Sequence, residues 1–232
     1  MITSLKSFEF LSGVIAAALA YFIITMFSGY FQAWVARKLG DDTAEEEGFL
    51  TLNPSIYIDP IGFMLFLWTG FGWGKPVPIN PFNFHGKYRR LEMLFTYGSQ
   101  TIANAVLACI SLWLMTTMFG GITGTKPLPT FFVEHPAVMR ALRLVISSMT
   151  IFSVFFTLYS MMLALFRMVI IQWLGHLRMQ WHETELISLL LAMLLLFVFN
   201  DPLAILMQWV VIHAESLMWY WWITISHLFG SK

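Results

Sequence analysis

From Phe8 to Phe27 the chain reads FEFLSGVIAAALAYFIITMF, with Glu9 as the one charged residue in the stretch. An α-helix needs about 20 mostly apolar residues to cross the hydrocarbon core of a bilayer. The helical pattern continues to Leu39, where Gly40 can end a helix. We therefore predict a transmembrane helix over residues 8–39. A cleaved signal peptide is excluded because the apolar run is too long and no small-residue cleavage site follows it.

The composition of the whole chain extends this conclusion. Of its 232 residues, 58% are hydrophobic and 11% are charged, whereas a soluble domain carries about 25% charged residues. Such a chain cannot cover a water-facing surface, which excludes a soluble enzyme, a disordered tail and a fibrous repeat. The formal net charge is zero, so electrostatics give no reason to expect a nucleic-acid partner. The composition indicates an integral membrane protein.

Five further apolar stretches follow the first one along the chain. We predict an all-α, polytopic helical bundle with about six transmembrane helices, which together form a single membrane domain over residues 1–232. The second stretch is short and is interrupted by glycines, so it crosses obliquely or re-enters the same side. The predicted segments after the first are 61–73, 91–119, 139–173, 186–199 and 203–229.

The segment from residue 33 to residue 84 carries polar and proline motifs that ordinary membrane helices lack. A tryptophan motif precedes a Leu-Gly-Asp turn, and asparagine-proline and aspartate-proline turns follow. A proline-rich stretch then leads away from a Gly-Trp-Gly sequence. The motifs are Ala33-Trp34-Val35-Ala36, Leu39-Gly40-Asp41, Leu50-Thr51-Leu52-Asn53-Pro54, Asp59-Pro60-Ile61-Gly62 and Gly72-Trp73-Gly74-Lys75-Pro76-Val77-Pro78-Ile79-Asn80-Pro81.

This order of motifs resembles the bacterial site-2 protease family, the zinc metalloproteases that cut substrates inside the membrane. In that family a helix with HExxH leads into AWVA and LGD, followed by LTLNP, DPxG and GWAKPVPVNP. The resemblance covers roughly residues 14–190 and is strong in the central third. It implies a site-2 protease-like core and a bacterial inner membrane. The positive-inside rule places the N-terminus in the cytoplasm, because eight of the 13 basic residues fall on that side.

In the same alignment, this chain lacks the residues that the family's reaction needs. A catalytic zinc takes three protein ligands and a water, and two histidines spaced i, i+4 share one helix face with a glutamate base between them. Aligned on Ala33-Trp34, the two histidine positions are Ser28 and Gln32, and the glutamate position is Gly29. The family's third ligand, an aspartate, falls on Gly175. The resemblance thus implies the fold, argues against the reaction, and predicts no catalytic residue, no metal site and no zinc cofactor.

Other residues provide only weak grounds for a rebuilt metal site. The six histidines form no i, i+3 or i, i+4 pair. The nearest grouping is His176 with His182 and Glu183, for which we favour an interfacial loop. Asp201 is a candidate for a displaced third ligand, but an aspartate before a proline is common at a turn.

The proline-rich stretch is the candidate site for a partner. Prolines favour an extended backbone and remove amide donors. In the resembled family this strip lies beside the substrate-binding cleft, and an exposed edge can pair with an unwound partner segment. A role restricted to packing the fold is the open alternative. The candidate residues are Lys75, Pro76, Val77, Pro78, Asn80 and Pro81.

Polar residues also interrupt the last apolar stretch. His213 and Glu215 lie within it, and an ionisable residue at membrane depth is a candidate for a functional site. One hypothesis is a proton path or a cofactor ligand. The other is an oblique helix in which Glu215 is protonated or hydrogen-bonded and the aromatic residues that follow form an interfacial belt.

The function predicted from these observations is that of a catalytically inactive site-2 protease homologue. It would bind transmembrane segments of other proteins as part of a hetero-oligomeric membrane complex, in contact with lipids and not with nucleic acid. One alternative is an active intramembrane metalloprotease with a rearranged zinc site. A further alternative is a cofactor- or pigment-associated membrane subunit that uses His213 or His176 as an axial ligand.

Overall fold

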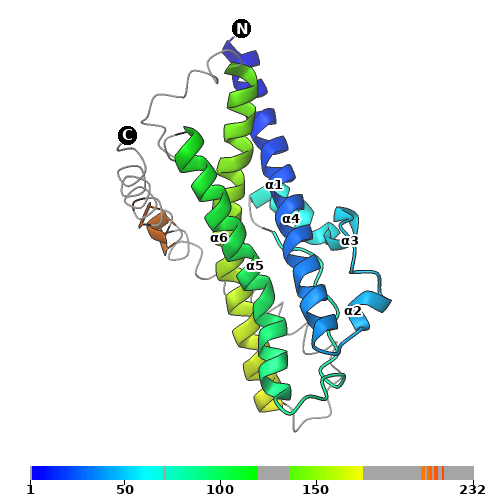
Figure 1. The fold of residues 1–232 in the computed structure, drawn as a ribbon. Coiled ribbons are helices and arrows are strands. Elements are labelled where there is room, and N and C mark those ends of the chain that lie inside the picture. Colours follow the sequence, from blue (N-terminus) through cyan, green and yellow to red (C-terminus); the bar gives the residue numbers. More distant parts are fainter. Residues whose placement is uncertain are drawn as a thin grey trace, which may run out of the picture. The chain divides into compact units, whose positions relative to one another are not determined.

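The computed structural model describes residues 2–69, 72–119 and 136–174, together with residues 205, 206, 208–210, 212, 213 and 216. Within these residues all regular structure is helical, which confirms the predicted all-α class (Figure 1). The elements are α1 (Ile2–Lys38), α2 (Thr43–Glu46), α3 (Pro54–Tyr57), α4 (Pro60–Thr69), α5 (Arg89–Phe119) and α6 (Pro136–Leu174).

Three of these helices are long and apolar enough to cross a membrane. They are Phe10–Lys38 in α1, Arg89–Phe119 in α5 and Ala137–Val169 in α6, with mean hydropathies of 2.2, 1.8 and 1.9. Helix α4 lies within the predicted second stretch and has 10 residues, fewer than the roughly 20 that a straight crossing needs. The predicted segment 186–199 and most of 203–229 lie outside the described residues.

Helix α1 ends through a glycine, as its sequence suggests. Gly40 has a φ of +100°, a conformation that costs glycine little because it has no Cβ atom. The Asp41 amide donates to the Ala36 carbonyl at 3.0 Å, and the Gly40 amide donates to Arg37. These bonds satisfy carbonyls that the end of a helix otherwise leaves without donors. The turn directs the chain into α2 and buries Asp41.

The chain divides into two compact units. The first unit comprises residues 21–105 and 155–200, and the second comprises residues 1–20, 106–154 and 201–232. In the second unit, α5 and α6 share a small core of Met115, Phe119, Met139 and Ile146.

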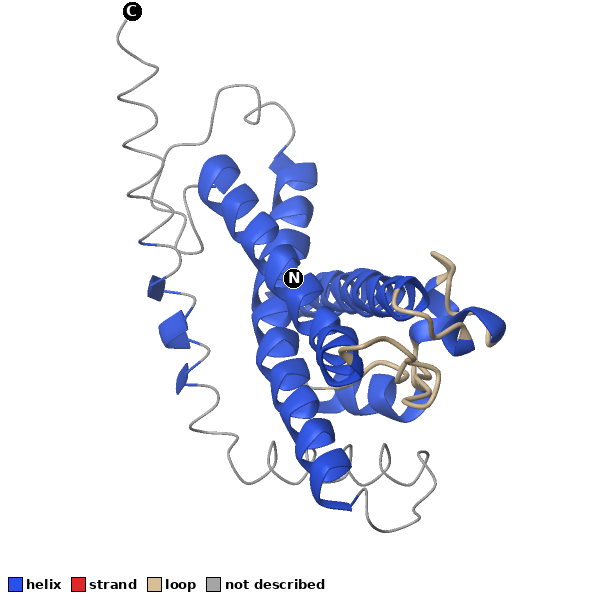
Figure 2. Cartoon of the chain, turned by 60° about the horizontal axis from the view of Figure 1, so that its bottom comes forward, coloured by secondary structure: helices blue, strands red, loops and turns tan. Residues whose placement is uncertain are grey.

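The first unit contains the polar and proline motifs of residues 33–84 and a larger core. Its helices are joined by the loops drawn in tan in Figure 2. The aromatic rings of Phe49 and Tyr57 meet edge to face with centroids 5.7 Å apart. The buried members of this core come from α1, α2, α3, α5, α6 and the loops between them; they are Ala33, Ala44, Phe49, Tyr57, Val77, Ile79, Phe84, Met93, Tyr97 and Ala164.

Two glycines allow the backbone after α4 to return against that helix. A Cβ atom at Gly62 would lie 2.2 Å from the Trp73 carbonyl oxygen, and one at Gly72 would lie 2.3 Å from the Gly62 carbonyl oxygen. On its other side the Trp73 carbonyl accepts a 2.7 Å hydrogen bond from the Tyr21 hydroxyl of α1. This close approach sets where the proline-rich strip begins.

Candidate functional site

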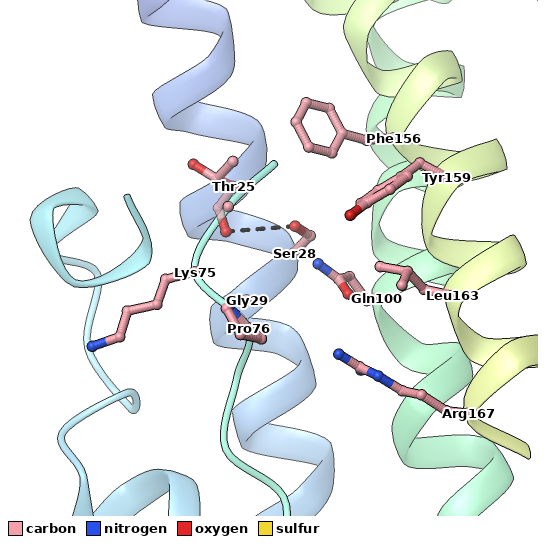
Figure 3. Close-up of a pocket in the computed structure, with 11 residues that line it drawn as sticks. Thr25, Ser28, Gly29, Lys75, Pro76, Gln100, Phe156, Tyr159, Leu163 and Arg167 are labelled. Carbon is pink, nitrogen blue, oxygen red and sulfur yellow. Dashed lines mark hydrogen bonds between the residues drawn. The ribbon is translucent and has the colours of Figure 1, made fainter. Parts of the chain in front are cut away.

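A small cavity lies inside the first unit, beside the start of the proline-rich strip. It is bordered by α1, by the strip, by α5 and by α6 (Figure 3). Its volume is about 20 Å³, which is room for about one water-sized group. The lining residues are Thr25, Ser28, Gly29, Gly74, Lys75, Pro76, Gln100, Phe156, Tyr159, Leu163 and Arg167.

The structure brings two of the aligned protease positions to this cavity. Ser28 is 1% exposed, and its hydroxyl donates to the Ile24 carbonyl one turn earlier at 2.8 Å. Gly29 also lines the cavity. Gln32 is 1% exposed and does not line it: its amide Nε2 donates instead to the Thr96 carbonyl of α5 at 3.3 Å. Gly175 lies outside the described residues.

These side chains do not fit a zinc ion. Catalytic zinc is bound by imidazole, thiolate or carboxylate groups, whereas Ser28 supplies a hydroxyl and Gln32 an amide, each already engaged in a hydrogen bond to a carbonyl. Among the described residues, no group of three or more His, Cys, Asp or Glu side chains is placed to hold a metal ion. His176, His182, Glu183 and Asp201 lie outside the described residues.

The space beside Gly29 is occupied by Tyr57. A Cβ atom at position 29 would lie 2.4 Å from the Cδ1 atom of the Tyr57 ring. Tyr57 is held there by its hydroxyl, which donates to the carbonyls of Phe49 and Thr51, the latter at 2.9 Å. Burial raises the pKa of the Tyr57 phenol to about 12, because the charged phenolate loses its hydration inside a protein.

Tyr57 therefore makes stability depend on pH at the alkaline end. Its folded pKa of about 12 lies above the ordinary value of 10.0, so its contribution to stability is complete below pH 10 and is lost as the pH rises from 10 to 12. We expect the unfolding temperature in detergent to fall across this window, and to fall less in Tyr57→Phe.

The Tyr57→Phe variant also loses the hydrogen bond that the hydroxyl shares between the two carbonyls, about 0.5–1.5 kcal/mol, and so starts from a lower unfolding temperature at neutral pH. The matched control is Tyr88→Phe, since Tyr88 is an exposed tyrosine. An alkaline decline of the same size in wild type and in Tyr57→Phe would contradict this assignment.

The proline-rich strip, residues 75–81, runs extended from the cavity toward the end of α1. It starts at an antiparallel bridge between Ile58 and Gly74, next to a 2.8 Å bond from the Lys75 amide to the Tyr57 carbonyl. The predicted partner-binding residues divide by exposure: Lys75 is exposed, while Val77 and Pro78 are buried. Pro76, Asn80 and Pro81 lie between these extremes.

A buried aspartate fixes the far end of the strip. The Asp41 carboxylate accepts hydrogen bonds from the Asn80 amide at 2.8 Å and from the Asn83 side chain at 2.9 Å. The Thr43 hydroxyl donates to the same carboxylate at 2.6 Å. Beyond the strip, the Arg89 guanidinium donates to the Pro81 carbonyl at 2.8 Å. The sequence reasoning missed this role of Asp41, although the residue stands in the Leu-Gly-Asp motif.

The cavity also contains residues that the sequence reasoning did not single out. Tyr159 and Arg167 are buried on α6, and the Arg167 guanidinium lies 5.2 Å from the centre of the Tyr97 ring. Gln100 of α5 completes the polar part of the lining. Of these residues, Arg167 is the one that the sequence could have revealed, because a basic residue inside an apolar helix indicates a functional site.

The other predicted polar site lies in the last apolar stretch, of which the structure describes only some residues. His213 is exposed, its Nδ1 atom lies 2.8 Å from the Trp209 carbonyl oxygen, and its ring stacks on Trp209 with centroids 4.1 Å apart. Glu215 lies outside the described residues. The described part of this segment thus places His213 on the surface of its unit.

The three apolar helices make the chain a helical membrane protein, and a comparison with known proteins shows a relationship to peptidases. The chain is 39% identical over 103 residues to "Putative zinc metalloprotease YwhC" of Bacillus subtilis (strain 168). The aligned part covers 42% of this chain and 46% of that relative, so the chain matches about half of the relative's length. No family model and no solved structure matches the chain. The partial match supports the resemblance to site-2 proteases.

Proposed function

We propose that the chain is a catalytically inactive member of the site-2 protease family that binds transmembrane segments of other membrane proteins. It would do so as a subunit of a hetero-oligomeric complex in the bacterial inner membrane, surrounded by lipid and without a zinc ion. The observation that carries this proposal is the filled space beside Gly29, where Tyr57 occupies the volume that any side chain would need.

The argument against catalysis rests on position as well as on chemistry. A general base must come within hydrogen-bond reach of the water that it activates, and glycine has no group that can take a proton. The Tyr57 ring is fixed by its hydroxyl to the loop at Phe49 and Thr51, so it cannot move aside cheaply. Protein interiors are close-packed, and an added side chain requires a neighbour to shift.

The argument for binding rests on the preserved strip. Asp41 and Arg89 fix its end, while the bridge at Gly74 fixes its start. A rigid extended segment can bind an unwound partner with little loss of conformational entropy. The proline-rich strip is present and fixed at both ends, while the catalytic position is filled. This combination favours binding without cleavage.

The name of the Bacillus subtilis relative favours a second candidate function, an active intramembrane metalloprotease. In that case the zinc ligands would come from a rearranged set, for which His176, His182 and Glu183 are the nearest grouping in the sequence. Zinc content separates the two candidates, because a catalytic site must hold the ion through three protein ligands.

The test is the composition and activity of the particle extracted from native membranes in mild detergent. We expect partner proteins in fixed stoichiometry, less than one zinc per ten chains, and no cleavage of a transmembrane substrate. A photo-cross-linking residue at Lys75 should capture a partner, while the same residue at the exposed Lys87 should not. One zinc per chain with cleavage that His176→Ala abolishes would establish the second candidate instead.

A further inference from the structure

The cavity of the first unit is lined by hydrogen-bond donors and by a positive charge. Arg167 contributes a guanidinium, Tyr159 a phenol and Gln100 an amide, and within the described part of the chain no aspartate or glutamate lines the cavity. Figure 3 shows the Tyr159 hydroxyl, the Gln100 amide and the Arg167 head group directed into the space between α1 and α6, whereas the Lys75 ammonium points away. The cavity therefore presents donors and lacks an anion.

Tyr159 supplies the clearest sign of a missing ligand. Its side chain is 5% exposed, and its buried hydroxyl has no hydrogen-bond partner among the residues that the structure describes. Buried polar groups almost always have a partner, since leaving one unsatisfied is costly. The ring cannot easily turn the hydroxyl elsewhere, because it is stacked on Phe155 at 6.1 Å with an interplanar angle of 8°.

Arg167 lies on the same face of α6 as Tyr159. Residues 159, 163 and 167 follow one another at i, i+4 and i+8, which places their side chains along one side of a helix. Arg167 is 7% exposed, and its guanidinium faces the Tyr97 ring at 5.2 Å. A guanidinium binds the two oxygens of a carboxylate with matching geometry. Acidic residues inside membranes pair with basic residues in just this way.

The size of the cavity limits what can enter it. A volume of about 20 Å³ accommodates the tip of a side chain, and the cavity is too small for a whole ligand. The Ser28 hydroxyl also lines the cavity and donates to the Ile24 carbonyl. A carboxyl group that arrives from a neighbouring helix would meet Arg167, Tyr159 and Gln100 together.

We propose that this cavity binds the carboxyl group of an aspartate or glutamate in a transmembrane segment of a partner protein. The inference deepens the proposed function and rests on it, since it names the group by which a bound segment is recognised. The position that served catalysis in the resembled family would then serve to select acidic membrane segments.

The test uses the full chain in lipid nanodiscs with three synthetic transmembrane peptides. Each is a 22-residue leucine-alanine helix with a fluorescent label, and the three differ only at the central residue, which is Glu, Gln or Leu. Energy transfer from the labelled protein measures the dissociation constant within the bilayer. We expect the Glu peptide to bind at least tenfold more tightly than the Gln and Leu peptides.

Matched variants assign this preference to the cavity. Tyr159→Phe removes only the hydroxyl, and Arg167→Met keeps an unbranched apolar stem without the guanidinium and its charge; each should reduce the preference for Glu to less than threefold. The controls are Tyr88→Phe and Arg90→Met at exposed positions of the same unit, which should retain it. Because Arg167→Met can impair folding, Tyr159→Phe decides the result if the methionine variant does not reach a wild-type unfolding temperature.

The outcomes separate this inference from the proposed function. Equal binding of the three peptides would overturn carboxyl recognition and leave binding of membrane segments intact. A Glu preference that persists in Tyr159→Phe and in Arg167→Met would overturn the assignment to this cavity. If no peptide binds while native partners co-purify, carboxyl recognition is wrong and the proposed function stands. If no partner co-purifies either, both are wrong.

Discussion

Alanine at Gly62 is expected to prevent the first unit from reaching its native packing. The new Cβ atom would lie 2.2 Å from the Trp73 carbonyl oxygen, well inside contact distance. The clash is with backbone, which cannot rotate away as a flexible side chain can. The same carbonyl accepts the Tyr21 hydroxyl, so moving it also breaks a buried hydrogen bond. We expect a loss of about 3 kcal/mol or more, at or above the usual range for overpacking.

The matched control is Gly98→Ala in α5. Nothing lies within 4 Å of a Cβ atom at that position, and alanine favours a helix over glycine by about 0.5–1 kcal/mol. Thermal unfolding in detergent should therefore show a large decrease for Gly62→Ala and no decrease for Gly98→Ala. A wild-type unfolding temperature in Gly62→Ala would show that α4 does not pack against Trp73 as described.

The second large effect is expected from Asp41→Ala. This change removes the acceptor of the Asn80 amide, the Asn83 side chain and the Thr43 hydroxyl, all at 2.9 Å or less. Hydrogen bonds to a charged group contribute about 1.5–3 kcal/mol each, and the donors here are only partly buried, so water can replace part of that loss. We expect a loss of about 3–5 kcal/mol and release of the end of the proline-rich strip.

Asp42→Asn tests whether the effect belongs to Asp41. Asp42 is the next residue, it is exposed, and it makes no side-chain hydrogen bond to cap α2. Hydrogen exchange should increase over residues 75–81 in Asp41→Ala and remain at the wild-type level in Asp42→Asn. Protection of the strip in both variants would show that Arg89 and the bridge at Gly74 suffice to hold it.

The fold class could be predicted from the sequence because it depends on local patterns. The apolar run that starts at Phe8 predicts a membrane helix, and Gly40 marks the point where α1 ends. The glycines at 62 and 72 signalled an interrupted second stretch, which the structure describes as the short α4. Each of these signals lies within the segment that it describes.

The candidate site could be predicted only in part, because its contacts join distant segments. Ser28 and Gly29 were identified through a motif alignment and do line the cavity. The bond between Asp41 and Asn80 joins residues that are 39 positions apart. No periodic pattern in the sequence predicts that two such distant residues come into contact. Tyr159 resembled ordinary packing in an apolar helix, since only the tertiary structure shows that its hydroxyl lacks a partner.

Tyr57 affects how easily a protein of this kind could regain catalytic activity during evolution. On the proposed family relationship, its ring occupies the volume into which a glutamate at position 29 would extend. Reversion at position 29 alone would then meet a clash at Tyr57, and the zinc ligands at positions 28, 32 and 175 would still be missing. If the proposed function holds, single mutations would rarely reverse the loss of activity. Descendants of such a protein would diversify in what they bind more readily than they would return to proteolysis.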